Sequence, residues 1–527
     1  MSDLLEQDSL PASMISNLIP EQLSDSPVRT SDIVKPWAEK SPESVALVEA
    51  AGAWTYRELS AAINQTRIWL ESLGVRPGDR VMVVCENSRA TIAIFLALGA
   101  MEAWPVLVNA RLSGQEIDQV RDHSGARRLI YTVAVSVHAR KHAQRQGATV
   151  AEVPGLGALG IGQLHDDVQP EPLEENISDR VGALIYTSGT TGRPKGVMLT
   201  HRNLLFAAGV SSKIRALTPA DRMYGLLPIS HIVGLSVVLL GTLLSGASLY
   251  LSARFDPSEV IRTIDDEKIT VMLGAPALFT LLIEYGKHKG LNSLKCPMLR
   301  IISCSGAPLS PSTKCEVEKL FGRTLHQGYG ITECSPSVAQ YRIEDPPTDN
   351  SVGPIVPGVE VKFVNRNGQT VGEGEEGELW VRGPNVMKGY YRAPEETAAS
   401  LSSDGWFNTR DLARMENGNL FIVGRTKDMI IRFGFNVYPA EVEAVLNAHP
   451  AVARSAVVGR MVEGDEEIVA FVQLQPNLQA STDELAKHAA QNLAAYKQPT
   501  QIVLVAEMPV TPLGKVIKDQ LLTRMNG

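Results

Sequence analysis

Residues 186–196 read YTSGTTGRPKG, a short segment with three glycines, four serine or threonine hydroxyls and one lysine. It follows the apolar run VGALIY at 181–186, which predicts a strand. The segment therefore leaves the carboxyl end of a strand, where open α/β sheets place their ligands. Glycines let backbone N–H groups converge and Lys195 adds a positive charge, so we predict a cradle for phosphate oxygens.

Composition alone would also permit a flexible surface loop, but a lysine inside the cluster favours anion binding. The segment is not a Walker A loop, because Pro194 precedes the lysine and no serine or threonine follows Gly196.

The overall composition bounds the class of protein. A chain of 527 residues is too long for one core, and 44% hydrophobic with 20% charged residues is typical of a soluble globular protein. The net charge of −8 argues against nucleic acid as a partner. Five cysteines without CxxC spacing and an N-terminus without an export signal indicate reduced thiols and a cytoplasmic location.

One stretch tests the expectation of solubility. Residues 225–253 contain no Lys, Arg, Asp or Glu, and the stretch is long enough to cross a bilayer. Pro228, His231 and several glycines interrupt it, so we interpret it as a buried helix that leads into a buried strand. No stable membrane insertion is expected.

The pattern of elements predicts three regions. Apolar strands alternate with helices up to about residue 350, which indicates parallel α/β sheets. Short alternating strands and glycine turns from about Val352 suggest an antiparallel β-rich subdomain. After Arg425 comes a small α+β module of about 100 residues, large enough to fold alone. The expected divisions are an irregular leader at 1–30, an N-terminal domain at 31–424, a hinge at 425–427 and a mobile C-terminal domain at 428–527.

Several motifs together resemble the adenylate-forming, or AMP-binding, superfamily, in its acyl-CoA synthetase and aryl-CoA ligase branch. After the glycine-rich segment they follow in order: SGAP (305–308), HQGYGITE (326–333), FNTRD (407–411), GRTKDMIIRFGFNVYPAEVE (424–443) and PLGKVIK (512–518). The resemblance implies that family's fold, with a large N-terminal domain and a small mobile C-terminal domain. It also implies ATP, Mg²⁺ and coenzyme A as reactants and cofactor.

By this resemblance, Tyr329 stacks on adenine, Asp411 and Arg425 hold the ribose, Thr332 contacts the α-phosphate and Glu333 binds Mg²⁺. The expected catalytic residues are Lys515, Thr187, Lys195 and Glu333. The full set implied for the nucleotide is Thr187, Ser188, Gly189, Thr190, Thr191, Gly192, Lys195, Gly306, Ala307, Pro308, Gln327, Gly328, Tyr329, Gly330, Thr332, Asp411, Arg425 and Lys515. The sequence TRD stands where the family commonly has Thr-Gly-Asp, so Arg410 alters the approach to the ribose site.

The resemblance implies a reaction in two steps. A carboxylate attacks the α-phosphorus of MgATP, with Lys515 between the two anions, and a thiol then displaces AMP from the acyl-adenylate. Lys427 matches the hinge about which the C-terminal domain turns between these steps. The resemblance also implies a tunnel for the pantetheine arm of CoA, formed by His231, Phe433, Gly434 and Phe435.

The acid pocket is predicted at His231, Ile232, Val233, Ser305, Gly306, Gly328 and Gly330. No acidic residue stands near His231 to pair an ammonium, so an amino acid is disfavoured as substrate. His231 fits a core histidine as well as a pocket residue. Gly328 deepens the slot, which favours a longer planar acid, hydroxycinnamate-like or benzoate-like, or a medium-to-long-chain fatty acid.

Three other functions stay open at this stage. They are a stand-alone adenylating enzyme that loads a carrier protein, a luciferase-like oxidase and a nucleotide-binding homologue without turnover. Retention of Lys515 argues against the last of these, because binding alone does not need it. The expected partner is a small carboxylic acid, and a homodimer is left open.

Overall fold

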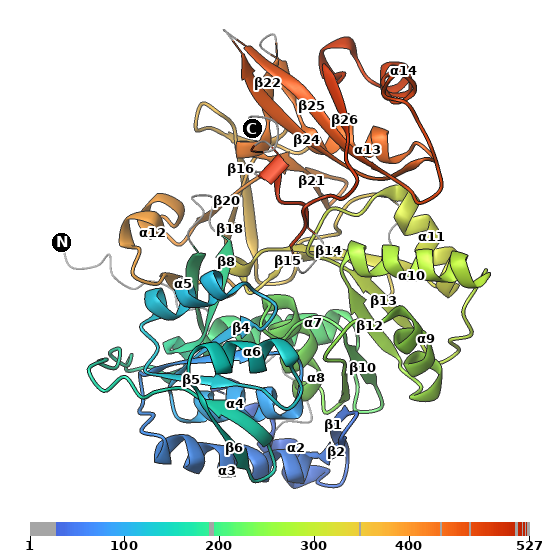
Figure 1. The fold of residues 1–527 in the computed structure, drawn as a ribbon. Helices are drawn as coiled ribbons and strands as arrows, with labels where there is room; N and C mark the ends of the chain where they lie inside the picture. The colour runs from blue at the N-terminus through green and yellow to red at the C-terminus, as the bar shows by residue number, and fades with distance from the viewer. Residues whose placement is uncertain are drawn as a thin grey trace, which may run out of the picture.

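Two large β-sheets share one layer of helices in the computed structural model, which describes residues 28–188, 194–346, 349–432, 435–462, 465–511, 515–518, 520, 521 and 523 (Figure 1). Most of the predicted leader, the loop residues Gly189–Gly192 and the tunnel residues Phe433 and Gly434 lie outside this set.

The first sheet carries the glycine-rich segment. Its strands, in spatial order, are β19 (Gly389–Tyr390), β9 (Pro194–Thr200), β8 (Val181–Ser188), β4 (Trp104–Asn109), β3 (Arg80–Cys85), β5 (Arg128–Tyr131), β7 (Gly157–Ile161) and β6 (Thr149–Val153). Strand β8 runs parallel to β4 and antiparallel to β9. The segment therefore joins the two strands of a hairpin, with Thr187 opposite Lys195.

The second sheet carries the SGAP and QGYG motifs. Its order is β15 (Ser337–Gln340), β14 (Leu325–Gly330), β13 (Ile301–Cys304), β12 (Val271–Gly274), β10 (Arg222–Gly225), β11 (Ser248–Leu251), β1 (Val45–Glu49) and β2 (Gly52–Thr55). Strands β10 to β14 are parallel, as predicted, and the edge strands β2 and β15 are antiparallel.

Helices cover both faces of both sheets. They are α2 (Lys35–Lys40), α3 (Tyr56–Ser72), α4 (Arg89–Ala100), α5 (Gly114–Ser124), α6 (Val137–Arg145), α7 (His201–Ile214), α8 (Gly241–Leu244), α9 (Pro257–Asp266), α10 (Pro276–Lys289) and α11 (Pro311–Phe321). Thr55 and Glu58 form the predicted capping box of α3. Side chains of α4 and α7 share one core with strands of both sheets, so these helices lie between the sheets.

Residues 225–253 add a helix to this inner layer and then return to the second sheet, which confirms a buried helix leading into a buried strand. A π-helix, η3 (Val233–Leu240), continues into α8 and then β11, and all residues of η3 and α8 are buried. Among the described residues, no helix combines the length and apolar character that a bilayer crossing requires.

The antiparallel β-rich region is confirmed as a five-stranded sheet. Its order is β17 (Thr370–Val371), β16 (Glu360–Val364), β18 (Gly377–Arg382), β20 (Phe407–Glu416) and β21 (Asn419–Arg425), and α12 (Pro394–Ser400) lies between β19 and β20 in the chain. Strand β21 ends at Arg425, the first residue of the predicted hinge.

The C-terminal module follows a short 3₁₀ turn, η5 (Thr426–Asp428). Its elements are β22 (Ile430–Arg432), β23 (Phe435–Val437), α13 (Pro439–Asn447), β24 (Val452–Val462), β25 (Asp465–Leu474), α14 (Thr482–Asn492) and β26 (Gln501–Leu504). It has its own apolar clusters, built on both faces of the β24–β25–β26 sheet. In Figure 1 this orange-to-red module sits above the two large sheets.

The entry of η3 depends on a glycine. A Cβ on Gly234 would lie 2.0 Å from the carbonyl oxygen of Pro228, a backbone atom that has little freedom to move. We predict that Gly234→Ala lowers the free energy of unfolding by about 2 kcal/mol or more, through overpacking.

The matched control is Gly241→Ala in the same inner layer, where the nearest atom to the new Cβ is the Ser212 hydroxyl oxygen at 3.2 Å. Guanidinium unfolding followed by tryptophan fluorescence checks both variants. Equal losses in the two would contradict the close backbone approach at Gly234.

Candidate active site

Three predicted nucleotide residues from distant segments meet at one carboxylate. The Asp411 residue is only 3% exposed. Its Oδ1 pairs with Arg425 Nε at 2.9 Å, and its Oδ2 accepts a hydrogen bond from the Tyr329 hydroxyl. Burial, reinforced by the Asp411 charge, raises the pKa of Tyr329 well above its usual value, so the phenol remains a donor. The residues predicted for adenine and ribose therefore form one cluster.

The β14–β15 connection shapes the wall beside this cluster. A Cβ on Gly330 would lie 1.6 Å from the carbonyl oxygen of Pro336, so only glycine fits there. At Gly328 the nearest atom would be the Ala339 carbonyl oxygen at 3.2 Å, a tight but less severe approach. The SGAP segment follows the end of the adjacent parallel strand β13, with Gly306 at a φ of 91°. Gln327 and Thr332 flank Tyr329 in β14 and in the following 3₁₀ turn, η4 (Thr332–Cys334).

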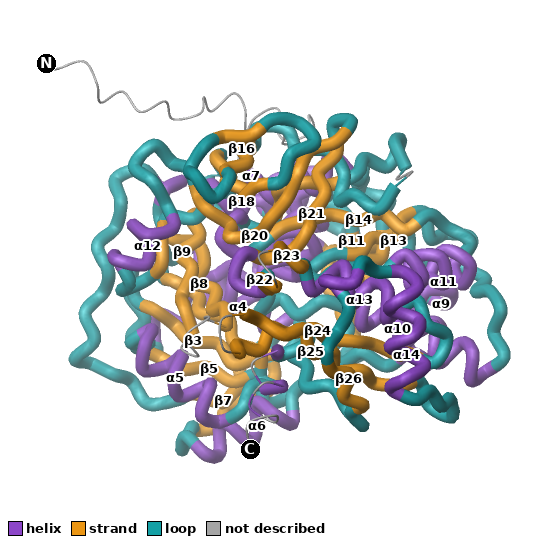
Figure 2. Tube along the Cα trace, turned by 90° about the horizontal axis from the view of Figure 1, so that it is seen from above, coloured by secondary structure: helices purple, strands orange, loops and turns teal. Residues whose placement is uncertain are grey.

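The predicted metal ligand and the loop lysine lie near one tyrosine. The Tyr390 hydroxyl donates to Glu333 Oε1 at 2.9 Å, and the Lys195 ammonium lies 5.2 Å from the centre of the Tyr390 ring. Lys195 also forms an ion pair with Glu396 on α12, which Figure 2 shows beside β8 and β9. Tyr390 and Glu396 were missed by the sequence reasoning, because both lie in GYYRAPEE, outside the quoted motifs.

The residues at this point fit a magnesium–nucleotide site. Mg²⁺ is usually held by one or two protein carboxylates, with phosphate and water completing its shell. Within the described ranges, no group of three or more His, Cys, Asp or Glu side chains could hold a metal ion. Glu333, held by the Tyr390 hydroxyl, supplies one carboxylate of the kind that such a site uses.

The departure at Arg410 has a structural consequence. Arg410 adopts a φ of 58°, in the left-handed region that favours glycine. Its N–H donates to Asn408 Oδ1 at 2.8 Å and its side chain is exposed. The next residue, Asp411, keeps its buried position, so the substitution strains the backbone without displacing the carboxylate.

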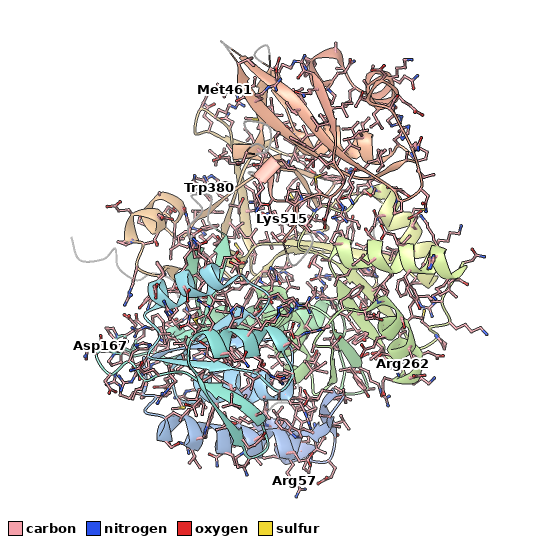
Figure 3. All side chains as sticks on the ribbon, viewed as in Figure 1. Arg57, Asp167, Arg262, Trp380, Met461 and Lys515 are labelled. Carbon is pink, nitrogen blue, oxygen red and sulfur yellow. The ribbon has the colours of Figure 1, made fainter. Side chains whose placement is uncertain are left out.

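The charge of one lysine of the C-terminal module acts on a residue of the predicted acid pocket. Burial and the nearby positive charge of Lys515 lower the pKa of His231 to about 4. The backbone of Lys515 is paired with Thr511, whose N–H donates to the Lys515 carbonyl oxygen at 2.7 Å. Figure 3 places Lys515 where the module meets the larger part of the chain. His231 precedes η3, so Ile232 and Val233 lie beside it at the entry of this buried helix.

Other predicted residues are described only in part. Gly189–Gly192, Phe433 and Gly434 lie outside the described residues, and the side chains of Ser188, Lys427 and Phe435 are likewise not described. The backbone places Lys427 in η5, between the five-stranded sheet and the C-terminal module, as a hinge requires. The hinge and the CoA tunnel remain predictions.

Comparisons with known proteins match this arrangement. The AMP-binding enzyme family matches residues 34–391, and the AMP-binding enzyme C-terminal domain matches residues 441–515. The chain belongs to the AMP-binding enzyme family. A feruloyl-CoA synthase of Amycolatopsis sp is 35% identical over 92% of this chain and 97% of its own length.

Two solved structures share the whole fold. ATP-bound MatB of Rhodopseudomonas palustris superposes with a TM-score of 0.82 at 28% identity, covering 94% of this chain and 98% of its own. The O-succinylbenzoate coenzyme A synthetase MenE of Bacillus subtilis, in complex with ATP and magnesium ion, gives 0.80 at 30% identity, covering 93% and 99%. These matches confirm the predicted family, fold and class of enzyme, an AMP-forming acid–thiol ligase. The ATP and magnesium in these relatives accord with the predicted reactants.

The proximity of Lys515 to His231 is testable in solution. We predict that Lys515→Ala raises the His231 pKa above about 4 but leaves it below the usual 6.5, because burial is the larger cause of its shift. Histidine-selective NMR titration measures this. His201 is the internal control, because its pKa is also near 4 but is set by burial and by charges other than Lys515. An unchanged His231 would contradict the placement of the module.

The contact between Tyr390 and Glu333 gives a second prediction. Tyr390→Phe removes one hydrogen bond to the predicted metal carboxylate, and we expect the KM for MgATP to rise about fivefold, which corresponds to ~1 kcal/mol. Tyr391→Phe is the matched control, because the Tyr391 hydroxyl bonds Glu171 instead. If the KM for MgATP rose equally in both variants, the increase would come from altered packing and not from the lost hydrogen bond to Glu333.

Proposed function

We propose that the chain is an ATP-dependent carboxylic acid–CoA ligase whose acid is aromatic, of the hydroxycinnamate or benzoate type. The observation that carries the proposal is the tie of Asp411 to Arg425 and Tyr329, which brings the predicted ribose and adenine residues together; the charge of Lys515 also acts on His231 of the predicted acid pocket. A medium-to-long-chain fatty acid is the second candidate, because Gly328 adds depth to the slot. The name of the feruloyl-CoA synthase relative supports the aromatic acid.

In the first step, the substrate carboxylate attacks the α-phosphorus of ATP and pyrophosphate leaves. Two anions must meet, so the barrier contains a large electrostatic cost. Lys515 is positioned to offset it from the acid side, and Lys195 must exchange its ion pair with Glu396 for phosphate oxygens. His231 is neutral at neutral pH, so it adds no second charge beside Lys515. Asp411 and Arg425 hold the ribose, and Tyr329 stacks on the adenine.

Glu333 would hold the magnesium ion that accompanies the nucleotide, and that ion would supply positive charge against the phosphates. Tyr390 orients this carboxylate through its hydrogen bond to Oε1. Thr187 and Lys195, opposite one another in the β8–β9 hairpin, flank the loop proposed to hold the phosphates.

In the second step, the thiolate of CoA attacks the acyl carbonyl carbon and AMP leaves with the electron pair of the broken C–O bond. We propose that the module at 428–527 turns about residues 425–427 to bring Phe433–Phe435 to the site in place of Lys515. The N-terminal domain is then 31–424. A carrier-protein thiol is the alternative acceptor, and a non-catalytic homologue is the alternative without turnover. We also propose a cytoplasmic location. Light scattering would determine whether the protein forms a homodimer.

The two steps respond differently to one substitution. We predict that Lys515→Ala lowers acid-dependent ATP–pyrophosphate exchange by about 10²–10³-fold, because one preorganised positive charge is lost. Thioester formation from supplied acyl-adenylate should keep most of its rate. Equal loss in both half-reactions would contradict a lysine that serves only the first.

Measurements of AMP release identify the substrate acid and the thiol that accepts the acyl group. Benzoates, cinnamates and C4–C16 fatty acids are compared with and without CoA. The proposal predicts CoA-dependent release with an aromatic acid. If AMP release required a carrier protein instead of CoA, the chain would be the stand-alone adenylating enzyme that loads a carrier protein.

A further inference from the structure

One buried asparagine of the first sheet holds the chain segment that leads to the predicted acid pocket. Asn87 lies in the turn between β3 and α4 and is only 6% exposed. Its Nδ2 donates to the carbonyl oxygens of Gly225 and Leu227, each at 3.0 Å, and its Oδ1 accepts from the Ile229 N–H at 2.8 Å. Both N–H groups and the oxygen of this amide are therefore engaged by residues 225–229, which follow β10 in the second sheet.

The segment 225–229 obtains these bonds from a side chain because its own sequence interrupts regular pairing. Strand β10 ends at Gly225, and Pro228 has no N–H to donate. Buried backbone groups nevertheless need partners. The amide of Asn87 supplies them on both sides of the proline, to the Leu227 carbonyl and to the Ile229 N–H.

The turn that carries Asn87 is fixed by bonds of its own. The Thr91 N–H donates to Ser88 Oγ at 3.1 Å, which caps the start of α4. Arg89 Nε donates to Glu49 Oε1 on β1 at 2.8 Å. These bonds do not involve the segment 225–229, so Asn87 can set the position of that segment from a firm base.

The position of the segment is passed on to His231. The His231 N–H donates to the Pro228 carbonyl oxygen at 2.9 Å, and the Val233 N–H donates to His231 Nδ1 at 3.3 Å. A Cβ on Gly234 would lie 2.0 Å from the Pro228 oxygen and 2.9 Å from the Leu227 oxygen. The segment and the entry of η3 are thus packed so closely that neither can shift without the other.

We propose that Asn87 is a positioning residue for the acid, which it serves by holding the segment 225–229 and, through it, His231 and the entry of η3. It acts through these residues, because its own amide is already engaged. Reactions of bound groups are sensitive to small errors in their placement, so loss of this amide should weaken use of the acid. The inference rests on the proposed function and adds to it a residue from the first sheet.

A second buried asparagine offers a matched control, because it holds a different segment in a similar way. Asn203 Nδ2 donates to the carbonyl oxygens of Pro384 and Val386, each at 2.8 Å, and its Oδ1 accepts a backbone N–H at 2.8 Å. The next residue, Met387, donates its N–H to the Glu333 carbonyl oxygen at 2.8 Å. Asn203 therefore supports the residue predicted to bind magnesium.

The variants Asn87→Leu and Asn203→Leu remove each amide at similar volume, and initial rates of ATP–pyrophosphate exchange compare them. The probe acid is the member of the benzoate, cinnamate and C4–C16 panel with which the wild type releases AMP fastest. We expect Asn87→Leu to raise the KM for this acid about tenfold or more and that for MgATP less than about twofold. Asn203→Leu should show the reverse. Both variants should melt at a lower temperature, since each leaves buried carbonyl groups unpaired.

Histidine-selective NMR titration provides a readout that does not depend on activity. Asn87→Leu should raise the pKa of His231 from about 4 towards the usual 6.5, because burial is the larger cause of its shift and a loosened segment admits water to the ring. Asn203→Leu should leave the pKa of His231 unchanged.

Equal increases in both KM values with Asn87→Leu, or a fall in kcat alone, would mark a merely structural asparagine and overturn the inference. An unchanged pKa of His231 in this variant would also overturn it. If the wild type exchanged pyrophosphate with no acid of the panel while His231 still responded to Asn87→Leu, the proposed function would fail and the link from Asn87 to His231 would stand.

The variants Asn87→Ser and Asn203→Ser decide the question if a leucine variant does not fold. Serine leaves room for water to bridge the carbonyl groups, so these variants should be more stable. The same opposite changes in the two KM values are expected, and equal changes would again overturn the inference.

Discussion

The buried carboxylate of Asp411 is the interaction on which the site depends. It is tied to Arg425 on the neighbouring strand and to Tyr329 from the second large sheet, so one ion pair and one hydrogen bond connect three segments. A buried carboxylate left without these partners would be strongly destabilising, by about 3–5 kcal/mol. The chain therefore holds its proposed ribose and adenine residues in place before a nucleotide arrives.

The other charged groups of the site are paired or neutralised by neighbouring side chains. Lys195 is paired with Glu396 and Glu333 accepts a hydrogen bond from Tyr390, so both groups proposed for the triphosphate have local partners that a nucleotide can replace. Lys515 belongs to a separate module with its own core, and burial together with the Lys515 charge keeps His231 neutral. A charge that serves only one step is well carried on an element that can move between steps.

Much of this architecture could be predicted from the sequence, because apolar strands, the capping box of α3 and the motif spacing are local signals. The α/β sheets, the antiparallel β-rich region and the buried course of residues 225–253 followed from them. The hairpin at the glycine-rich segment did not, since nothing local sets the direction of β9. The roles of Tyr390 and Glu396 depend on contacts between distant segments, and no local pattern signals such contacts.

The central claim is that a carboxylate oxygen attacks the α-phosphorus of ATP at this site. Supplying the acid with both carboxyl oxygens as ¹⁸O, together with ATP and CoA, tests it by mass spectrometry of the nucleotide product. The account predicts AMP with one ¹⁸O atom and unlabelled pyrophosphate. AMP without the label, or label in inorganic phosphate, would contradict it.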